Sequence, residues 1–174
     1  GNRTMDHLSR DWRHCRIDTP LGPLTLARTP AGLCGTWFDD QRDAPPAARF
    51  AADQAQPQDP LLQAAADQLQ AYFDGQLQQF DLPLDLSAGT AFQQTVWQGL
   101  LEIGHGQLGH YGALAQRIGK ATAVRAVGGA IGRNPLSIIV PCHRVLGSGG
   151  QLTGYSGGLW RKQALLRLEG HSLS

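Results

Sequence analysis

Apolar and polar side chains alternate along the first forty residues, which is the pattern of strands with one buried face. The alternation predicts strands over residues 14–18, 24–27 and 33–38, with a turn at residues 29–32. Because the connections are short, we expect neighbouring strands to pair antiparallel, as a meander.

An apolar stripe at helical spacing follows. It runs from Leu61 to Phe73, with Gly75 as a natural C-terminal stop, and predicts a helix covering one face of the sheet. Residues 41–59 are rich in Ala, Pro, Asp and Gln without a period, so we interpret them as a surface connection.

A second unit is predicted to begin at residue 90, which divides the chain into domains 1–89 and 90–174. Thr90 and Gln93 have capping-box spacing before a helix ending near Gly104. Short helical patterns over residues 111–118 and 121–131 then flank a two-residue turn, in the form of a helix-turn-helix. The expected fold class is α/β (α+β), with a three-stranded antiparallel sheet and helices followed by a helical domain.

The pattern over residues 121–131 consists almost entirely of small apolar residues, with Arg125 as its one charge. Such a helix can approach DNA closely without reading base edges. A tightly packed core helix has the same composition, so the sequence leaves both interpretations open.

Charge is distributed unevenly. Residues 1–90 hold 7 basic and 12 acidic residues and residues 91–174 hold 8 and 2, so the halves carry formal charges of −5 and +6. The asymmetry indicates that the C-terminal half meets a polyanion, although a solvated helical surface would give the same count.

Other classes of protein fit the composition poorly. No apolar run approaches the ~20 residues that span a bilayer, and no secretion signal is recognisable, so we expect a soluble cytoplasmic protein without membrane contact. Residues 1–4, before Met5, are expected to be a tag remnant. Cys15, Cys34 and Cys142 form an odd set without CxxC spacing, so neither disulfides, a metal nor a cofactor is expected.

Candidate chemistry lies in the run Ser-Ile-Ile-Val-Pro-Cys-His-Arg-Val at residues 137–145. The β-branched residues predict a strand that stops at Pro141 and presents Cys142 and His143, a thiol beside a potential base. Adjacent side chains on a continuing strand point to opposite faces, so the two cooperate only if the chain turns or water bridges them. A structural cysteine beside a surface histidine is the alternative.

Five blocks in order resemble the O6-alkylguanine-DNA alkyltransferases, in sequence and in spacing. They are Arg-Ala-Val-Gly-Gly-Ala at 125–130, Asn-Pro at 134–135, Pro-Cys-His-Arg-Val at 141–145, Gly-Tyr-Ser-Gly-Gly at 154–158 and Glu-Gly at 169–170. The likeness is dense from about residue 92 to 170. Thr-Pro-Leu-Gly at 19–22 with Gly-Leu at 32–33 is similar to the family's opening hairpin.

The resemblance implies a ribonuclease H-like N-terminal domain and a DNA-repair activity. An O6-alkylguanine, and also an O4-alkylthymine, would be flipped from the duplex and its alkyl group moved irreversibly to Cys142, once per molecule. His143 would take the thiol proton through a water, with Glu169 orienting it and Asn134 tying the recognition helix to the nucleophile segment.

The resemblance also assigns contacts to substrate and DNA. Tyr111 would donate toward guanine N3, the Ser156 backbone toward O6, and the carbonyls of Cys142 and Val145 would accept from the exocyclic amine, with Tyr155 as a wall. Arg125 would fill the gap left by the base, with Ala123, Ala126, Gly128 and Ser148 as further DNA contacts. The expected partner is double-stranded DNA bound through the minor groove by a monomer, with cooperative assembly left open.

Three other functions remain as alternatives. A non-catalytic lesion sensor of similar fold would lack the acceptor cysteine. A transcription regulator would carry polar base readers on its recognition helix. A cysteine hydrolase would turn over repeatedly, whereas one transfer per molecule excludes it.

Overall fold

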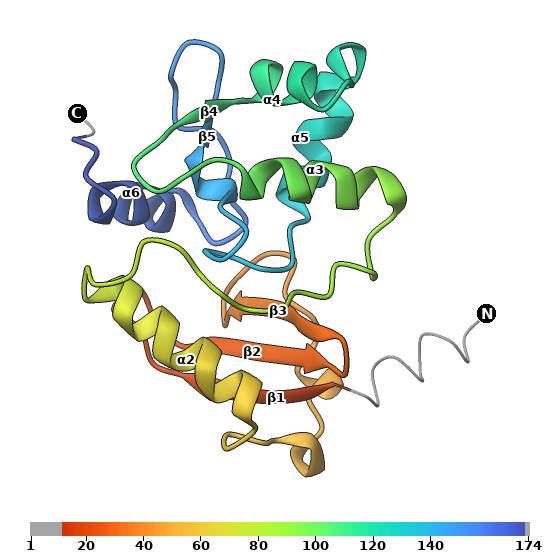
Figure 1. Cartoon of the computed structure of the whole chain (residues 1–174), viewed down its shortest axis with the longest axis vertical. Helices are drawn as coiled ribbons and strands as arrows, with labels where there is room; N and C mark the ends of the chain where they lie inside the picture. Colours follow the sequence, from red (N-terminus) through yellow and green to blue (C-terminus); the bar gives the residue numbers. More distant parts are fainter. Residues whose placement is uncertain (1–11, 173–174) are drawn as a thin grey trace. The chain divides into compact units, whose positions relative to one another are not determined.

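The computed structural model describes residues 12–172 and divides into two compact units between Leu86 and Ser87 (Figure 1). The expected tag remnant at residues 1–4 lies outside the described residues. Within the described part of the chain, no helix has the length and apolarity needed to cross a membrane.

The N-terminal unit is built on a three-stranded antiparallel sheet. Strands β1 (Arg13–Ile17), β2 (Leu24–Thr29) and β3 (Gly32–Phe38) pair in sequence order, with a register irregularity between Ala27 and Arg28. The predicted meander is confirmed.

Helix α2 (Pro60–Phe73) packs against all three strands and buries Leu62, Leu69 and Tyr72. Asp59 begins the helix, because its carboxylate accepts hydrogen bonds from the Leu61 and Leu62 amides at 3.1 and 3.0 Å. The position of the helix therefore follows from the apolar stripe and its cap.

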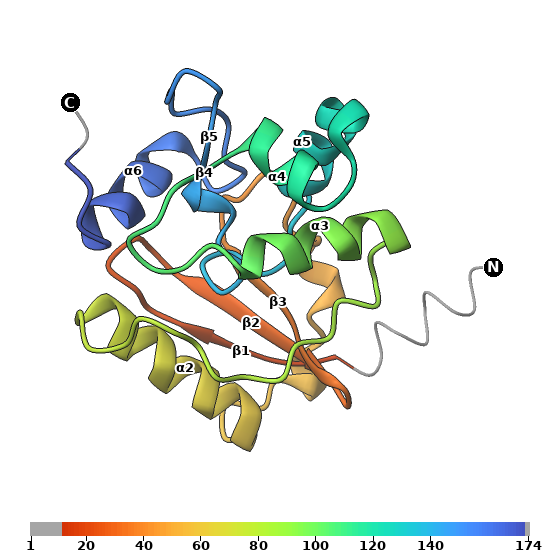
Figure 2. The ribbon, with the colours of Figure 1, turned by 45° about the horizontal axis from the view of Figure 1, so that its top comes forward.

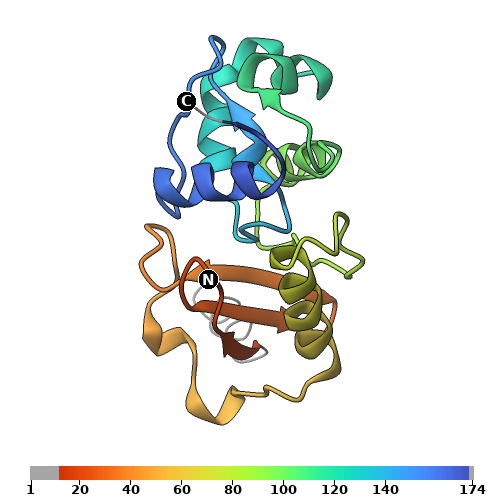
Figure 3. The ribbon, with the colours of Figure 1, turned by 90° about the vertical axis from the view of Figure 1, so that its left-hand side faces the viewer.

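The connection at residues 41–59 lies on the side of the sheet opposite α2 (Figure 3). It contains two short 3₁₀ turns, Ala47–Arg49 and Ala52–Gln54, and its Phe50 packs beside the stacked rings of Trp12 and Trp37. A Cβ at Gly35 would lie 1.8 Å from the Trp37 ring, so glycine is what lets the indole lie across β3. The connection is thus part of the packing of this unit.

The C-terminal unit is mainly helical (Figure 2). Its helices are α3 (Ala91–Leu101), α4 (Tyr111–Arg117), α5 (Val124–Gly132) and α6 (Leu159–Leu168). The predicted capping box of Thr90 and Gln93 is present at the start of α3. Helix α4, a turn through Gly119 and α5 form the helix-turn-helix, although residues 121–123 are a 3₁₀ turn and α5 starts at Val124.

Helix α5 has two different faces. Val127, Ala130 and Ile131 are buried, and Trp97 Nε1 donates to the Ala130 carbonyl at 2.8 Å. Arg125 and Ala126 are exposed. One face of α5 is therefore packed in the core, and the other face, which carries Arg125, stays exposed.

The predicted strand over residues 137–140 is wrong, because these residues form a buried turn. The Asn134 side chain accepts from the Leu136 amide at 2.9 Å and donates to the Val140 carbonyl at 2.8 Å, which folds the segment back on itself. Ile138 has a φ of 76°, which a strand does not allow. The strand of this region is β5 (Val145–Leu146), which pairs parallel with β4 (Gly109–His110).

Candidate active site

Cys142 and His143 lie on a buried 3₁₀ turn, Cys142–Arg144, directly after Pro141. The sequence predicted that both residues lie at the end of a strand, and this prediction is wrong. The turn removes the geometric objection to a joint role, because neighbouring side chains no longer point to opposite faces of a strand.

Cys142 as a whole residue is 7% exposed, and Asn134 Nδ2 donates to its Sγ at 3.2 Å. Burial raises the pKa of the thiol, and the Asn134 hydrogen bond and the charge of Lys162 only partly oppose it. The resting thiol is therefore neutral at physiological pH, and a base must act on it before it becomes a nucleophile.

His143 meets Glu169 through Nε2 and Oε2, 2.7 Å apart, and both side chains are fully buried. Burial lowers the pKa of His143, and the Glu169 carboxylate opposes the shift. The neutral imidazole then carries its proton on Nε2, facing the carboxylate. Nδ1 is buried without a hydrogen-bond partner among residues 12–172, so it has an acceptor lone pair free.

Arg144, to which the sequence assigned no role, holds the other side of Glu169. Its Nε donates to Oε1 at 2.7 Å and its Nη2 to Oε2 at 3.1 Å, while Nη1 donates to the Ile103 carbonyl at 2.6 Å. Glu169 caps the C-terminal end of α6, where a negative charge is mildly unfavourable. The bidentate contact with the Arg144 guanidinium offsets this unfavourable interaction and fixes the carboxylate beside His143.

Lys162 is the functional candidate that the sequence analysis missed. It is completely buried on α6, and its Nζ donates to the carbonyls of Val145 at 2.6 Å and Thr153 at 3.0 Å. Burial lowers its pKa to about 8, and the charge of Cys142 opposes the shift. The sequence contained one signal for its burial. Lys162 lies three residues before Leu165, so helical spacing places it on the apolar side of the helix.

The expected substrate-contacting residues differ in exposure. Tyr111 is half-buried at the first residue of α4, where its hydroxyl accepts from Thr153 Oγ1 at 2.8 Å, and Ser156 is also half-buried. Tyr155 is buried, and burial raises its pKa well above the usual range, with the Cys142 charge adding to the shift and a Ser137 hydrogen bond opposing it. Tyr111 and Ser156 can therefore reach a ligand, whereas the Tyr155 side chain is enclosed by the protein.

The expected DNA-contacting residues lie on α5, the turn before it and the loop after β5. Arg125, Ala126 and Ser148 are exposed, and Ala123 and Gly128 are half-buried. A Cβ at Gly128 would lie 3.9 Å from the Tyr111 ring, which places Tyr111 beside α5.

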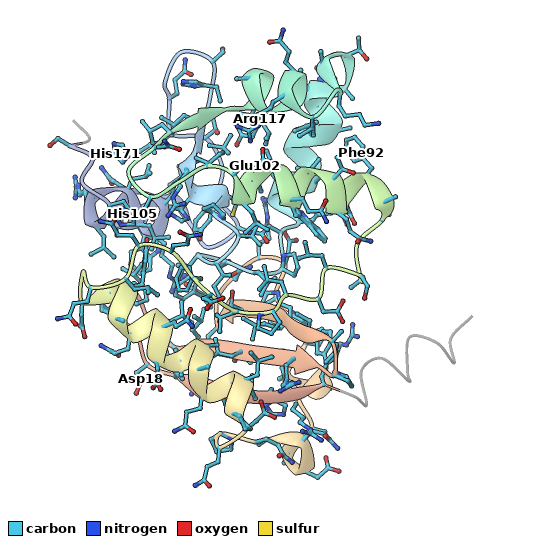
Figure 4. All side chains as sticks on the ribbon, in the orientation of Figure 1. Asp18, Phe92, Glu102, His105, Arg117 and His171 are labelled. Carbon is cyan, nitrogen blue, oxygen red and sulfur yellow. The ribbon has the colours of Figure 1, made fainter. Side chains whose placement is uncertain are left out.

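Part of the basic charge of this unit is internal. Arg144, Arg161 and Lys162 are buried. Arg117 donates to the Gly99 carbonyl at 2.6 Å and lies 3.5 Å from Glu102, which it faces between α4 and α3 (Figure 4). The remaining exposed cations are Lys120, Arg125, Arg133 and Arg167.

Cys15 and Cys34 are buried core residues of the N-terminal unit, and burial raises their pKa values to about 11 and about 12. Within the described part of the chain, no cluster of three or more His, Cys, Asp or Glu side chains could hold a metal ion.

Two family profiles match the chain. The "6-O-methylguanine DNA methyltransferase, ribonuclease-like domain" covers residues 13–86, and the "6-O-methylguanine DNA methyltransferase, DNA binding domain" covers residues 91–171.

Named relatives and solved structures point to the same family as the two profiles. The "Methylated-DNA--protein-cysteine methyltransferase" of Mycobacterium tuberculosis is 49% identical over 88% of this chain and 89% of its own, and that of Mycobacterium leprae 47% over 92% and 94%. The crystal structure of Mycobacterium tuberculosis O6-methylguanine methyltransferase superposes with a TM-score of 0.81 at 47% identity, over 91% of this chain and 92% of that one. The structure of Mycobacterium tuberculosis OGT in complex with DNA gives 0.78 at 47% identity, over 90% and 92%.

The predicted α/β fold class and the family resemblance are both confirmed by these matches. The two profiles together cover nearly the whole of the described chain, and the relatives are aligned over most of their own length. The chain belongs to the 6-O-methylguanine DNA methyltransferase family, the methylated-DNA–protein-cysteine methyltransferases.

Proposed function

We propose that this chain repairs alkylated DNA by direct reversal. It takes an O6-alkylguanine out of the duplex and transfers the alkyl group irreversibly to Cys142, once per molecule, with O4-alkylthymine as a second substrate. The observation that carries the proposal is the buried turn in which a neutral thiol adjoins a histidine bound to Glu169. Membership of the family and the named activity of its relatives support it.

The chemistry begins with removal of the thiol proton. The proton passes through a water to His143 Nδ1, and the imidazolium that forms is stabilised by Glu169, 2.7 Å from Nε2. Asn134 Nδ2, already 3.2 Å from Sγ, steadies the negative charge on sulfur.

The thiolate then displaces guanine from the alkyl carbon. An S–C bond forms while the C–O6 bond breaks, and the electron pair of that bond stays on the base, which takes up a proton to become ordinary guanine. A base leaves more easily when donors neutralise its developing charge. Tyr111 donates toward N3 and the Ser156 amide toward O6, the carbonyls of Cys142 and Val145 accept from the amine, and Tyr155 forms the wall.

The DNA side of the reaction uses α5. Its exposed face is made of small residues, so the helix can lie close to the backbone in the minor groove and act at any sequence. Ala123, Ala126 and Gly128 provide the close approach and Ser148 contacts a phosphate. Arg125 enters the stack and offsets part of the few kcal/mol that base extrusion costs.

One protein monomer acts on each lesion, because the site contains one acceptor thiol. The described cysteines are all free thiols, which fits the reducing cytoplasm. A damage sensor that binds without transfer is the alternative, and Cys142 argues against it since such a protein needs no acceptor.

The test is the intact mass of the full chain after incubation with duplex DNA carrying a single O6-methylguanine. We expect a gain of one methyl group, mapped to the Cys142 peptide, with guanine restored in the DNA and no second turnover. Cys142→Ala should abolish the transfer, while Cys15→Ala, the matched control in the N-terminal unit, should leave it intact. Tight lesion binding without a mass change would refute the proposal in favour of the sensor.

A further inference from the structure

Thr153 connects the loop after β5, residues 147–153, to Tyr111 at the start of α4, and neither the family motifs nor the proposed chemistry assigns it a role. Its Oγ1 donates to the Tyr111 hydroxyl at 2.8 Å, across 42 positions of sequence. Its carbonyl accepts from the buried Lys162 Nζ at 3.0 Å. One residue thus has its backbone fixed by the core and its side chain fixed on Tyr111.

The two hydroxyl oxygens are 2.8 Å apart, and each hydroxyl can both donate and accept. When Tyr111 donates to a base, Thr153 supplies the proton of their mutual contact and the phenol oxygen accepts it. A phenol oxygen that accepts a hydrogen bond also becomes a stronger donor, since bonds in a chain polarise one another. The contact therefore both orients the phenol and improves it as a donor to a third group.

A second link holds the loop in place at the same point. His110, the residue before Tyr111, has its Nδ1 3.0 Å from the Gly147 carbonyl, and the Gly147 amide donates to the Gln151 carbonyl at 3.0 Å. The strands β4 and β5, which carry His110 and lead into Gly147, are paired in parallel. Figure 2 shows the loop after β5 rising beside the start of α4. Thr153 is therefore presented to Tyr111 by a braced loop.

We infer that Thr153 is a positioning residue, which sets the Tyr111 hydroxyl to donate to the N3 edge of the flipped base and so speeds departure of the guanine. The inference rests on the proposed function, because it deepens the part assigned there to Tyr111. Thr153 acts only through the phenol and touches neither the alkyl group nor the thiol.

The experiment measures the first-order transfer rate at saturating duplex DNA, separately from DNA affinity. Thr153→Val keeps the shape and removes the hydroxyl, and we expect it to slow transfer about three- to tenfold, the effect of one neutral hydrogen bond, with affinity unchanged. Thr153→Ser restores the hydroxyl and should return most of the rate. Thr95→Val removes a hydroxyl that donates to the Ala91 carbonyl on α3, and should have no effect.

Two comparisons separate a positioning role from a general structural one. In a Tyr111→Phe background, Thr153→Val should cause no further loss, since its effect passes through the phenol oxygen. On DNA carrying O6-methyl-3-deazaguanine, which lacks the N3 acceptor, wild type and Thr153→Val should react equally slowly. The inference would be overturned if Thr153→Val slowed transfer further in the Tyr111→Phe background or on the 3-deaza substrate. It would also be overturned if Thr153→Val transferred the methyl group from ordinary O6-methylguanine as fast as wild type.

Failure of the inference and of the proposed function are distinguishable. If wild-type protein transfers the methyl group but Thr153→Val is as fast, Thr153 has no positioning role and the alkyltransferase reaction stands. If wild type transfers nothing to Cys142, the proposed function itself has failed. Should Thr153→Val melt well below wild type, Thr153→Ser and Thr153→Ala decide the point, because equal rates for these two would refute a role for the hydroxyl.

Discussion

Replacing Lys162 by methionine is expected to change how the stability of the protein depends on pH. The ammonium is fully buried, and burial lowers its pKa from 10.5 to about 8. Between these two values the unfolded chain holds a proton that the folded protein does not, so folded-state stability rises as pH increases. The cost of keeping the buried amine charged is therefore greatest below pH ~8 and is relieved by pH ~10.5.

The pKa difference sets the magnitude. A shift from 10.5 to about 8 corresponds to about 3 kcal/mol of unfolding free energy. Methionine fills a similar volume and removes both the charge and the hydrogen bonds to the carbonyls of Val145 and Thr153. Wild type should thus gain about 3 kcal/mol relative to Lys162→Met between pH ~7.5 and pH ~10.5.

Urea unfolding of both proteins at several pH values measures this difference. Ionisable groups that both proteins share contribute similarly to the two curves, so subtracting one curve from the other removes most of their contribution. Lys120→Met, the same substitution at an exposed position, controls for the loss of one positive charge. Parallel pH curves for wild type and Lys162→Met would show that the amine is not desolvated and would refute the reasoning.

Three further substitutions test other contacts. Glu169→Gln leaves the buried Arg144 guanidinium without its carboxylate, so urea unfolding should show a loss of about 3–5 kcal/mol, and wild-type stability would contradict the ion pair. Asn134→Ala removes the donor to Cys142 Sγ, so single-turnover transfer should slow, and an unchanged rate would exclude a role at sulfur. Burial raises the pKa of Asp59, but hydrogen bonds from the helix backbone and an arginine outweigh it and the net pKa is lowered. The stability advantage of wild type over Asp59→Asn should therefore be full above pH ~4 and shrink as pH falls through the folded pKa, in thermal melts, whereas a constant gap would argue against the cap charge.

The N-terminal unit follows closely from its sequence because its signals are local. Each predicted strand lies within one or two residues of its counterpart, and α2 begins at Pro60, directly after its Asp59 cap. Alternation and capping both act over a few neighbouring residues, so a window of sequence contains their cause. The packing of Phe50 on Trp12 and Trp37 was not predicted, because no period in the sequence links these positions.

The segment before Cys142 shows where local signals fail. Three β-branched residues at 138–140 favour a strand, but the conformation is set by the side-chain amide of Asn134, which bonds at both Leu136 and Val140. A buried polar side chain with two backbone partners outweighs a propensity of a few tenths of a kcal/mol. The turn at residues 136–140, directly before Pro141, therefore has its cause outside the apolar run.

Burial of charge was the least predictable feature, and it changes the meaning of the formal charge of +6. The asymmetry suggested a polyanion partner, yet Arg144, Arg161 and Lys162 contribute to it from the interior. These cations donate to carbonyls or to Glu169, and two of them lie around the Cys142 turn. A count of charges cannot separate exposed cations from buried ones, because it carries no information on burial. Lys120, Arg125 and Arg133 are exposed on or near α5, so the exposed charge of this unit and the buried charge around Cys142 come from different members of one basic set.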